Sequence, residues 1–512
     1  MRATRLGRAA EAAALLVLTA CARLPTGLRP CPTDAAPLFA VQAASSPYDS
    51  LFAAAGAEFR VPAELLKALG WVETRLQMVR GAEEFPGRPP AFGVMALRSP
   101  ALERGAALAG VTVEAARGDA RANIRAAAAL IQAYATETAI DRLRPDAWEP
   151  VVLRFAGITL PAGRAAYLRD VVRAHGLGAA AARLVALEPC PPEPAGARDY
   201  AAAVWRPSPN FNQRPGATGS THVVIVHTCE SNYASCWSWL VNSASQVSAH
   251  YVVNEEGSEM SQLVLERDRA WHIAALYDCD LNRGHHCSLN DAQSNDFTVG
   301  IEHAGFASQT AFPASQIEAS AALLCDITRD RGIPRDWQHV VAHGQLQPEN
   351  RTDPGPNWPW IAYLHRAQAL CGETVVDDSA RYNDATVASA NVPSGWGATN
   401  SAPDYYGGGY RWASTAPDAT DGAVFSFRVA AAGARTLDAR WTSGPNRSPR
   451  AAFSVVTEAG NTLGTVRVDQ RSGGGVWHTL GTWTFPAGWH RVVVSRRDST
   501  GTVVVADAVR VR

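Results

Sequence analysis

The sequence predicts a multidomain chain: an α-helical domain, then an α/β domain with a mixed central sheet, then an all-β sandwich. An Ala- and Leu-rich stretch over residues 47–188 repeats apolar side chains at three-and-four spacing, which is typical of packed helices. Residues 196–371 combine short β-branched runs with amphipathic helical segments, as α/β layer folds do. Residues 375–512 alternate apolar and polar positions between Gly, Asn and Ser turns, which predicts a sandwich.

Composition narrows the classes of function. The chain has 512 residues, 47% of them hydrophobic, which is enough for three or four domains. Its formal net charge is −1, and the sequence contains no Lys/Arg run or base-readout motif. We therefore expect no nucleic-acid partner.

The first residues resemble an export signal. Residues 1–21 combine a basic start, an apolar stretch over 12–19 and the tetrapeptide LTAC, which resembles a bacterial lipobox ending at Cys21. If this lipobox is used, Cys21 carries a lipid that anchors the chain in a membrane; otherwise a signal peptidase releases the protein. Both routes predict export to the bacterial cell envelope, as a periplasmic or outer-membrane lipoprotein or as a secreted protein. Residues 22–46 predict a flexible linker, and the Pro-rich stretch 188–197 predicts a hinge.

The nine cysteines also favour an oxidising compartment. Setting Cys21 aside leaves eight, the even number that a disulfide framework requires. Many pairings are open. Proximity and domain edges favour three of them: Cys279 with Cys287, Cys325 with Cys371, and Cys31 with Cys190.

Three residues of metal-binding type stand on frames rich in turn formers. His227 ends a β-branched run, His343 closes a similar short run, and Asp353 follows in a loop stiffened by Pro354 and Pro356. Two imidazoles and one carboxylate leave the fourth tetrahedral position of Zn²⁺ open, whereas structural zinc sites are usually filled by four protein ligands. The constellation therefore predicts a catalytic zinc site.

Residues from about 221 to 360 resemble the zinc-dependent N-acetylmuramoyl-L-alanine amidases, a group that includes the peptidoglycan recognition proteins. The matching segments, in chain order, are IVHTCES, QVSAHYVVNEEGS, RAWHIA, NDFTVGIEHAG, VVAHGQLQP and NRTDPGP. The resemblance implies that His227, His343 and Asp353 bind Zn²⁺. It also implies that the substrate is peptidoglycan, cut at the amide between N-acetylmuramic acid and the L-alanine of the stem peptide.

The same resemblance implies roles for further residues. Glu302 is similar to the general base that takes a proton from water and passes it to the leaving amine. Arg351 stands where the family usually has Lys, so its fixed charge suits an oxyanion but serves poorly as an acid. His272 would line the groove and contact the substrate carbonyl. Cys229 and Cys236 have the spacing of a small loop disulfide in the recognition proteins, which implies that Cys229 is bridged and is not a zinc ligand.

Simpler interpretations stand beside these. A lone His after a strand is commonly a hydrogen-bonded structural residue, and a lone Glu there serves as an ion-pair partner. For His272, the alternative to a groove-lining role is that the neighbouring Trp271 simply anchors a surface loop. His285 and His286, next to Cys287, are compatible with a second metal site, but their polar surroundings favour a solvated loop.

The helical stretch resembles the lysozyme-like lytic transglycosylases in LLKALGWVETRL, AFGVMAL, DARANIRAAAALI and WEPVVLRFAG. The resemblance implies that Glu73, in a partly apolar pocket that raises its pKa, protonates the glycosidic oxygen and then assists closure of an anhydro ring. Three residues depart from the pattern of this family: Thr74 stands where it usually has Ser, Ala96 where it has Gln, and Phe155 where an aromatic and a polar residue are expected. The domain is then an active transglycosylase, a degenerate domain that only holds glycan, or a structural domain.

The last segment resembles the golvesin and xanthan-lyase C-terminal carbohydrate-binding-like domains in VVDDS, YYGGGYRW, VDQRSGGGVWHTLGTWTF and VADAVRV. This implies binding to wall polysaccharide through exposed aromatic side chains, with a stabilising appendage as the alternative. Six aromatic residues are candidates, and we expect at least half of them in the core: Trp396, Tyr405, Tyr406, Tyr410, Trp412 and Trp477.

Three functions compete. The first is a peptidoglycan hydrolase that cleaves the muramoyl amide, with or without a second, glycan-cleaving activity. The second is a non-catalytic peptidoglycan receptor, and the third is a transglycosylase whose amidase-like half only docks substrate. Receptors of the recognition group commonly lack a zinc ligand, whereas this chain keeps His227, His343 and Asp353 together with Glu302, which favours the hydrolase.

Overall fold

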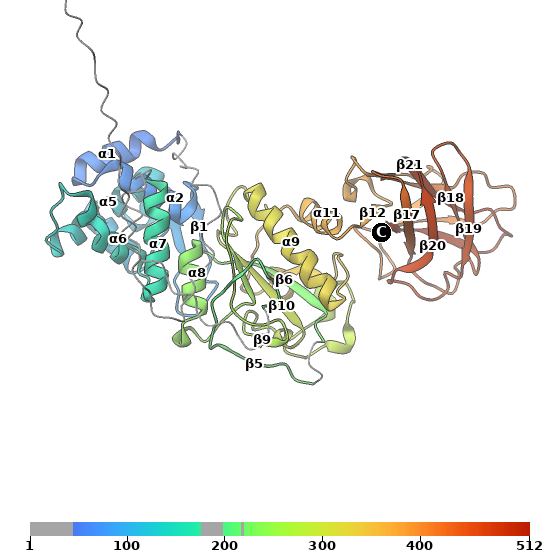
Figure 1. Cartoon of the computed structure of the whole chain (residues 1–512), viewed down its shortest axis with the longest axis horizontal. Helices are drawn as coiled ribbons and strands as arrows, with labels where there is room; N and C mark the ends of the chain where they lie inside the picture. Colours follow the sequence, from blue (N-terminus) through green and yellow to red (C-terminus); the bar gives the residue numbers. More distant parts are fainter. Residues whose placement is uncertain (1–44, 176–197, 217–219) are drawn as a thin grey trace, which may run out of the picture.

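The computed structural model describes residues 45–175, 198–216 and 220–512, and shows three bodies in chain order: helical, α/β and β-sandwich (Figure 1). Within these residues, no helix is long and apolar enough to cross a membrane. Several sequence-based predictions fall outside the described residues: the signal segment with Cys21, linker residues 22–44, the hinge 188–197 and the Cys31–Cys190 pair.

Helices α1–α7 and a small antiparallel sheet, in the order β1-β2-β3, form the first body. The helices are α1 (Asp49–Phe59), α2 (Ala63–Thr74), α3 (Ala101–Ala109), α4 (Val113–Gly118), α5 (Ala120–Glu137), α6 (Glu149–Ala156) and α7 (Pro161–Ala174). The strands are β1 (Val79–Arg80), β2 (Ala91–Gly93) and β3 (Leu97–Arg98). Helices α3 and α5 pack closely, because Gly105 of α3 has no side chain: a Cβ there would lie 2.6 Å from the carbonyl oxygen of Ala126 on α5.

A buried asparagine of α5 holds the small sheet and the turn between β2 and β3. Asn123 Oδ1 accepts from Met95 N (2.8 Å), and Nδ2 donates to Phe92 O (3.0 Å). Gly93 has φ +78° and no room for a side chain, since a Cβ would lie 2.1 Å from the Asn123 amide. The Thr74 hydroxyl at the end of α2 donates to a carbonyl of the same turn, Val94 O (2.7 Å). These bonds fix the end of α2, where Glu73 lies.

The second body is built on a mixed six-stranded sheet with the order β11-β6-β10-β7-β8-β4. The strands are β4 (Val204–Trp205), β6 (Val223–Thr228), β7 (Tyr251–Val253), β8 (Met260–Gln262), β10 (Thr298–His303) and β11 (Val340–Ala342). Strands β11, β6, β10 and β7 are parallel neighbours, whereas β7 and β8 are antiparallel. A separate pair joins β5 (Phe211–Gln213) to β9 (Asp268–Ala270). The predicted mixed central sheet is therefore present.

Helices cover this sheet, and disulfides tie its loops. The helices are α8 (Tyr233–Leu240), α9 (Ala314–Arg331), α10 (His343–Leu346) and α11 (Trp360–Leu370). Ile317, Leu324 and Tyr363 of α9 and α11 pack in one cluster with Val224 and Val226 of β6. Three predicted disulfides are confirmed: Cys229–Cys236, Cys279–Cys287 and Cys325–Cys371.

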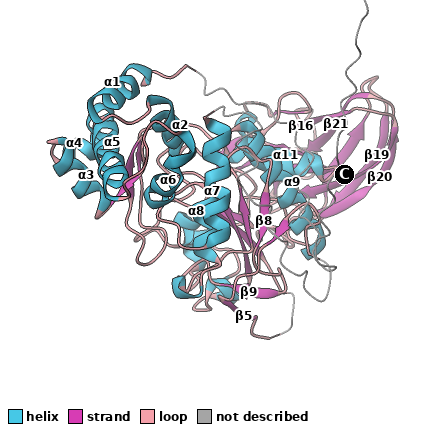
Figure 2. Ribbon diagram, turned by 60° about the vertical axis from the view of Figure 1, so that its left-hand side comes forward, coloured by secondary structure: helices cyan, strands magenta, loops and turns pink. Residues whose placement is uncertain are grey.

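The helical and α/β bodies share one hydrophobic core. Trp237 and Leu240 of α8 belong to the same buried cluster as Leu69 and Tyr167 of the helical body. Helices α7 and α8 lie side by side across the boundary (Figure 2). Gly163 of α7 approaches α8 so closely that a Cβ would lie 1.9 Å from the hydroxyl of Ser238. The two bodies therefore pack as one unit.

The third body is a β-sandwich of a four-stranded sheet, β12-β23-β17-β20, and a five-stranded sheet, β13-β16-β21-β18-β19, with the smaller sheet β14-β15-β22 beside them. Its strands are β12 (Thr374–Asp377), β13 (Ala388–Asn391), β14 (Gly397–Thr399), β15 (Tyr410–Ser414), β16 (Ala423–Val429), β17 (Gly433–Arg440), β18 (Ala451–Val456), β19 (Thr462–Val468), β20 (His478–Phe485), β21 (Gly488–Ser495), β22 (Val503–Ala506) and β23 (Ala508–Val511). Trp396, Tyr406 and Tyr410 are buried, as expected of half the candidate aromatics, whereas Trp412 is 39% exposed.

A buried ion pair docks the sandwich onto the α/β body. Arg440 Nη1 of β17 lies 3.0 Å from Asp336 Oδ2, and both side chains are 1% exposed. The Gln338 amide donates to Tyr405 O (3.0 Å) beside it. Such a pair is costly to break, because the partner left behind is a buried, unpaired charge.

Candidate metal centre and active site

Two neighbouring parallel strands place His227 and Glu302 side by side. Residue pairing aligns His227 on β6 with Glu302 on β10. Paired residues on parallel strands point to the same face, and the alternating residues Val226 and Ile301 pack against α9 and α11. His227 and Glu302 therefore face the opposite side of the sheet. His303 confirms the alternation, since its Nε2 lies 2.6 Å from the hydroxyl of Ser320 on α9.

The three predicted metal ligands meet at this face. His227 Nδ1 and His343 Nδ1 are 3.0 Å apart. Asp353 Oδ2 lies 3.3 Å from the first and 3.2 Å from the second of these nitrogens. His227 and His343 are at most 1% exposed and Asp353 is 2% exposed. The site is thus formed by one strand, the start of α10 and the loop that follows.

This arrangement fits a divalent cation. Ligand atoms held at about 2.0–2.2 Å in a tetrahedron are roughly 3.3–3.6 Å apart, close to the separations observed. Among the described residues, Asp353 Oδ1 and both oxygens of Glu302 have no hydrogen-bond partner although they are buried. Burial and then the carboxylates of Glu84 and Asp353 raise the pKa of Glu302 well above its ordinary value. A cation at the centre would offset this repulsion and give the buried carboxylate oxygens a partner.

The loop that carries Asp353 is held by backbone contacts. Gly344 N donates to Asp353 O (2.9 Å), which ties the loop to the first turn of α10. Gly355 has φ +91°, and a Cβ there would lie 1.9 Å from the carbonyl oxygen of Ala307. Only glycine allows this approach, so the PGP sequence sets the direction of the Asp353 carboxylate.

His272 lies behind the cluster of His227, His343 and Asp353 rather than in an open groove. It is 7% exposed, its Nδ1 lies 3.0 Å from His227 Nε2, and its Nε2 lies 3.1 Å from the hydroxyl of Thr298. A Cβ on Gly300 would be 2.5 Å from the His272 ring, so the missing side chain makes room for it. Since both ring nitrogens contact protein atoms, this position favours orienting His227 over contact with the substrate carbonyl.

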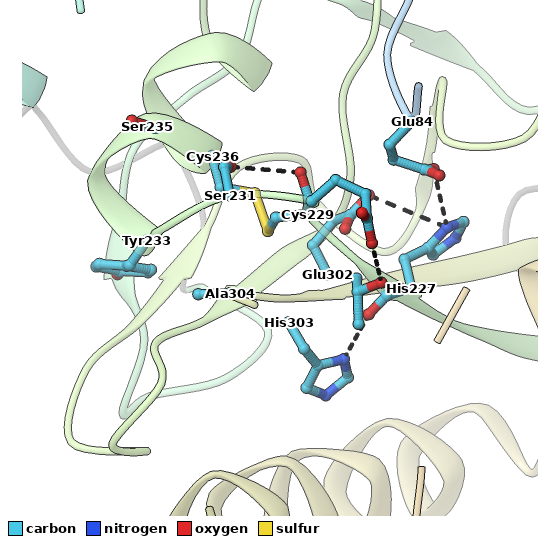
Figure 3. Close-up of a disulfide and its surroundings, with 12 residues drawn as sticks. Glu84, His227, Cys229, Ser231, Tyr233, Ser235, Cys236, Glu302, His303 and Ala304 are labelled. Carbon is cyan, nitrogen blue, oxygen red and sulfur yellow. Dashed lines mark hydrogen bonds and ion pairs between the residues drawn. A yellow bond between two sulfur atoms is a disulfide. The ribbon is translucent and has the colours of Figure 1, made fainter. Parts of the chain in front are cut away.

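A third carboxylate at this site, Glu84, was not predicted from the sequence. Glu84 reaches it from the loop between β1 and β2 of the helical body, as Figure 3 shows beside His227 and Glu302. Its Oε1 lies 3.1 Å from His343 Nδ1 and 3.8 Å from His227 Nδ1, and the residue is 5% exposed. One ligand atom each from Glu84, His227, His343 and Asp353 lies within 4.8 Å of the others. No local motif marks Glu84, because only the packing of two domains brings it here.

Arg351 lies at the rim of the site and contacts the same glutamate. Its Nη2 donates to the carbonyl oxygen of Glu84 (2.9 Å), and its Nε lies 3.5 Å from Glu84 Oε2. Its charge is therefore close to the site but directed at Glu84. Glu230 also borders this region, and burial raises its pKa to about 7, with Glu84 and Asp353 adding to the rise against two backbone hydrogen bonds.

Two neighbouring groups are not metal ligands. Cys229 and Cys236 lie near Glu302 but are bridged to each other, as predicted (Figure 3). Cys287, beside His285 and His286, is bridged as well. His285 Nε2 lies 3.7 Å from Asp404 of the sandwich. The loop that carries His285 therefore contacts the sandwich.

Glu73 lies in a separate cavity of about 570 Å³ between the helical and α/β bodies. The Tyr167 hydroxyl of α7 donates to Glu73 Oε1 (2.6 Å), and the amide of Asn232, next to α8, donates to Oε2 (3.0 Å). Burial raises the pKa of Glu73 although both hydrogen bonds lower it. Phe155 and Trp239 are among the lining residues. The sequence pattern missed both Tyr167 and Asn232.

Comparison with known proteins assigns the α/β body and the β-sandwich to families. Residues 217–356 match the family described as N-acetylmuramoyl-L-alanine amidase, and residues 376–512 match the Golvesin C-terminal domain. N-acetylmuramoyl-L-alanine amidase A of Achromobacter lyticus is 34% identical over 185 residues, which are 33% of this chain and 94% of that protein. The chain belongs to the N-acetylmuramoyl-L-alanine amidase family. It is accordingly an N-acetylmuramoyl-L-alanine amidase with a helical region before the matched segment and a β-rich domain after it.

Other similarities cover the amidase in part. Xanthan lyase of Bacillus sp. (strain GL1) is 37% identical over 120 residues, 22% of the amidase chain and 12% of the lyase. AmiD of Escherichia coli (strain K12) is 29% identical over 152 residues, so the chain spans half the length of that relative. A crystal structure of a selenomethionine AmpD derivative aligns with 34% of this chain and 97% of its own, at 24% identity and a TM-score of 0.27.

Proposed function

We propose that the amidase hydrolyses the amide between N-acetylmuramic acid and the L-alanine of the stem peptide with the help of Zn²⁺. His227, His343 and Asp353 would hold the ion. The observation that carries the proposal is the convergence of these three buried donors within 3.0–3.3 Å of one another. A non-catalytic receptor has no need of Glu302, buried and without a hydrogen-bond partner among the described residues, next to them.

The mechanism assigns a task to each side chain. When bound, Zn²⁺ supplies Lewis acidity at the scissile carbonyl and favours deprotonation of water. Glu302, whose Oε1 lies 4.0 Å from His227 Nδ1, accepts the water proton and delivers it to the leaving amine. The guanidinium of Arg351 stabilises negative charge on the carbonyl oxygen once it is turned toward the substrate. His272 holds the ring of His227 in place.

Digestion of purified peptidoglycan, followed by mass spectrometry of the products, tests this function. We expect free stem peptides from the wild-type protein, and none after chelation of zinc or in Asp353→Ala. Asp330→Ala, an exposed carboxylate on α9, serves as the matched control and should keep full activity. Absence of released peptide from a protein that binds zinc would reject the amidase mechanism and favour a peptidoglycan receptor.

A second activity, cleavage of the glycan strand by Glu73, is favoured by the cavity around it. A carboxylic acid with raised pKa beside a tyrosine hydroxyl suits a general acid. The same digestion tests it: anhydromuramic ends should be present with wild type, persist in Asp353→Ala and vanish in Glu73→Gln. Release of stem peptides without such ends would leave the helical domain, with its lysozyme-like resemblance, as a glycan holder.

The remaining parts locate the amidase at its substrate. The sandwich would bind wall polysaccharide, with the exposed Trp412 as a platform for sugar stacking. Export with a lipid on Cys21 would place the enzyme at the cell envelope. Pull-down on purified wall glycan with Trp412→Ala tests the first part, and mass measurement of the mature N-terminus tests the second.

A further inference from the structure

We propose that Glu84, contributed by the helical domain, is a fourth protein ligand of the metal and closes the site in this conformation. The proposal rests on the metal-dependent function above. It assigns to one side chain of a neighbouring domain both a bond to the ion and control of access to the amidase centre.

The distances place Glu84 among the ligands. Its Oε1 is 3.1 Å from His343 Nδ1, as close as Asp353 comes to the same nitrogen at 3.2 Å. Its separation from His227 Nδ1 is 3.8 Å, and all four donors lie within 4.8 Å of each other. Four donors bound to one ion at about 2.0–2.2 Å are roughly 3.3–3.6 Å apart in a tetrahedron, and the separations of Glu84 Oε1 from the two imidazole nitrogens, 3.1 and 3.8 Å, lie on either side of this range. A carboxylate that is near the site without a binding role has no reason to lie close to both imidazoles.

Contacts just before Glu84 and at Glu84 itself fix the residue in this place. Before it, Ala82 N donates to Glu230 Oε2 (2.9 Å), and Arg80 N donates to the hydroxyl of Ser308 (2.9 Å). At Glu84 itself, the carbonyl oxygen accepts from Arg351 Nη2 (2.9 Å). Phe85 follows and is 4% exposed. The loop is thus seated on the α/β body through backbone groups as well as through the carboxylate.

A fourth protein ligand changes what the site can do. Hydrolytic zinc sites keep one position for water or substrate, whereas sites with four protein ligands are closed. Here Glu84 takes that position and also engages Arg351, the cation proposed for the oxyanion. Hydrolysis therefore requires the loop to withdraw, so the resting enzyme is latent and its activity is set by the position of residues 81–90.

Metal binding by the full chain tests the ligand directly. We expect Glu84→Gln to weaken zinc affinity roughly ten- to hundred-fold in chelator competition. The same variant should alter the visible spectrum of the Co²⁺-loaded protein, which reports ligand number and geometry. The neighbouring Glu83 is exposed, so Glu83→Gln is the matched control and should change neither. Unchanged affinity and spectrum in Glu84→Gln, or no metal binding by wild type, would overturn the proposal.

Activity at saturating zinc then tests closure. Release of stem peptides should rise in Glu84→Gln, opposite in sign to its metal affinity, and a fall would overturn closure. If no protein releases peptide but Glu84→Gln still loses affinity, the ligand stands and only the amidase mechanism fails. Should Glu84→Gln not fold, Ser308→Ala loosens the loop while leaving every ligand in place. It should raise peptide release with unchanged zinc content, and no rise would overturn closure.

Discussion

Glu302 differs at the residue scale from the other carboxylates near the metal centre. Glu84 and Asp353 each lie within 3.2 Å of an imidazole nitrogen, whereas Glu302 Oε1 is 4.0 Å from the nearest, that of His227. Glu302 therefore stands one step outside the ligand set, at the distance where a group can handle a proton without binding the ion.

Replacing Glu302 by Gln should separate metal binding from catalysis. Because the change removes a base and keeps the shape, we expect zinc content and thermal stability close to wild type and kcat lower by roughly 10²–10⁴-fold. Zinc analysis and peptide-release rates check both parts. Loss of zinc together with activity would instead make Glu302 a ligand.

Local sequence predicted some of these residues and not others. His227, His343 and Asp353 stand within short segments whose strand, turn and proline pattern is legible from neighbouring residues. Glu84 and Asn232 carry no such pattern, because each acts on a site in the other body. The docking of two domains depends on contacts between residues far apart in the sequence. Local sequence patterns therefore do not reveal it.

At the element scale, the strands of the sandwich bring three carboxylates together. Asp377 at the end of β12 and Asp507 between β22 and β23 are at most 1% exposed, and Asp378 is 7% exposed. Burial raises the pKa of Asp378 to about 6 even though Arg411 opposes the rise. Burial and the neighbouring carboxylates raise the pKa of Asp377 well above its ordinary value. Folding therefore favours the protonated forms of these carboxyls relative to the unfolded chain.

The stability of the sandwich should consequently fall with rising pH. A carboxyl whose pKa is raised on folding contributes stability below its ordinary value near 4, and this contribution is lost as pH passes through the folded value of about 6. We expect the unfolding free energy to drop by roughly 1–3 kcal/mol between pH 5 and pH 8 in chelator. Asp377→Asn should flatten the dependence. Denaturant melts at both pH values measure it, and equal stabilities would contradict it.

Element types followed from the sequence more readily than their partners. Alternation in AVFSFRV predicted a strand, and β16 covers Ala423–Val429. The helical spacing of ASQIEASAALLCDITRDRG predicted α9, which runs over Ala314–Arg331. The loop between β1 and β2 was not foreseen as part of the amidase site, since loops lack periodicity and gain their place from contacts.

At the scale of the whole molecule, the core boundaries differ from the domain boundaries of the sequence. The helical and α/β bodies share a buried cluster that includes Trp237, whereas the sandwich has its own cluster around Trp441. The first two bodies should therefore unfold together, and the third should respond separately.

Two tryptophan substitutions test this arrangement. Removal of a buried tryptophan costs about 3–5 kcal/mol. Trp237→Ala should raise hydrogen exchange in α5 and α7 as well as in β6, and leave β16 to β21 protected. Trp441→Ala, the matched change, should affect only residues 374–511. Exchange confined to the α/β body in Trp237→Ala would show that the helical body is independent.

The segment that matches the amidase family, residues 217–356, contains His227, His343 and Asp353 but not Glu84. Recombination at the edges of that segment would thus transfer three donors of the metal centre to a new gene and leave the fourth behind. The recipient would encode an enzyme open from the moment of synthesis. In this chain, the proposed restraint on the amidase is therefore encoded outside the segment that encodes its other three metal donors.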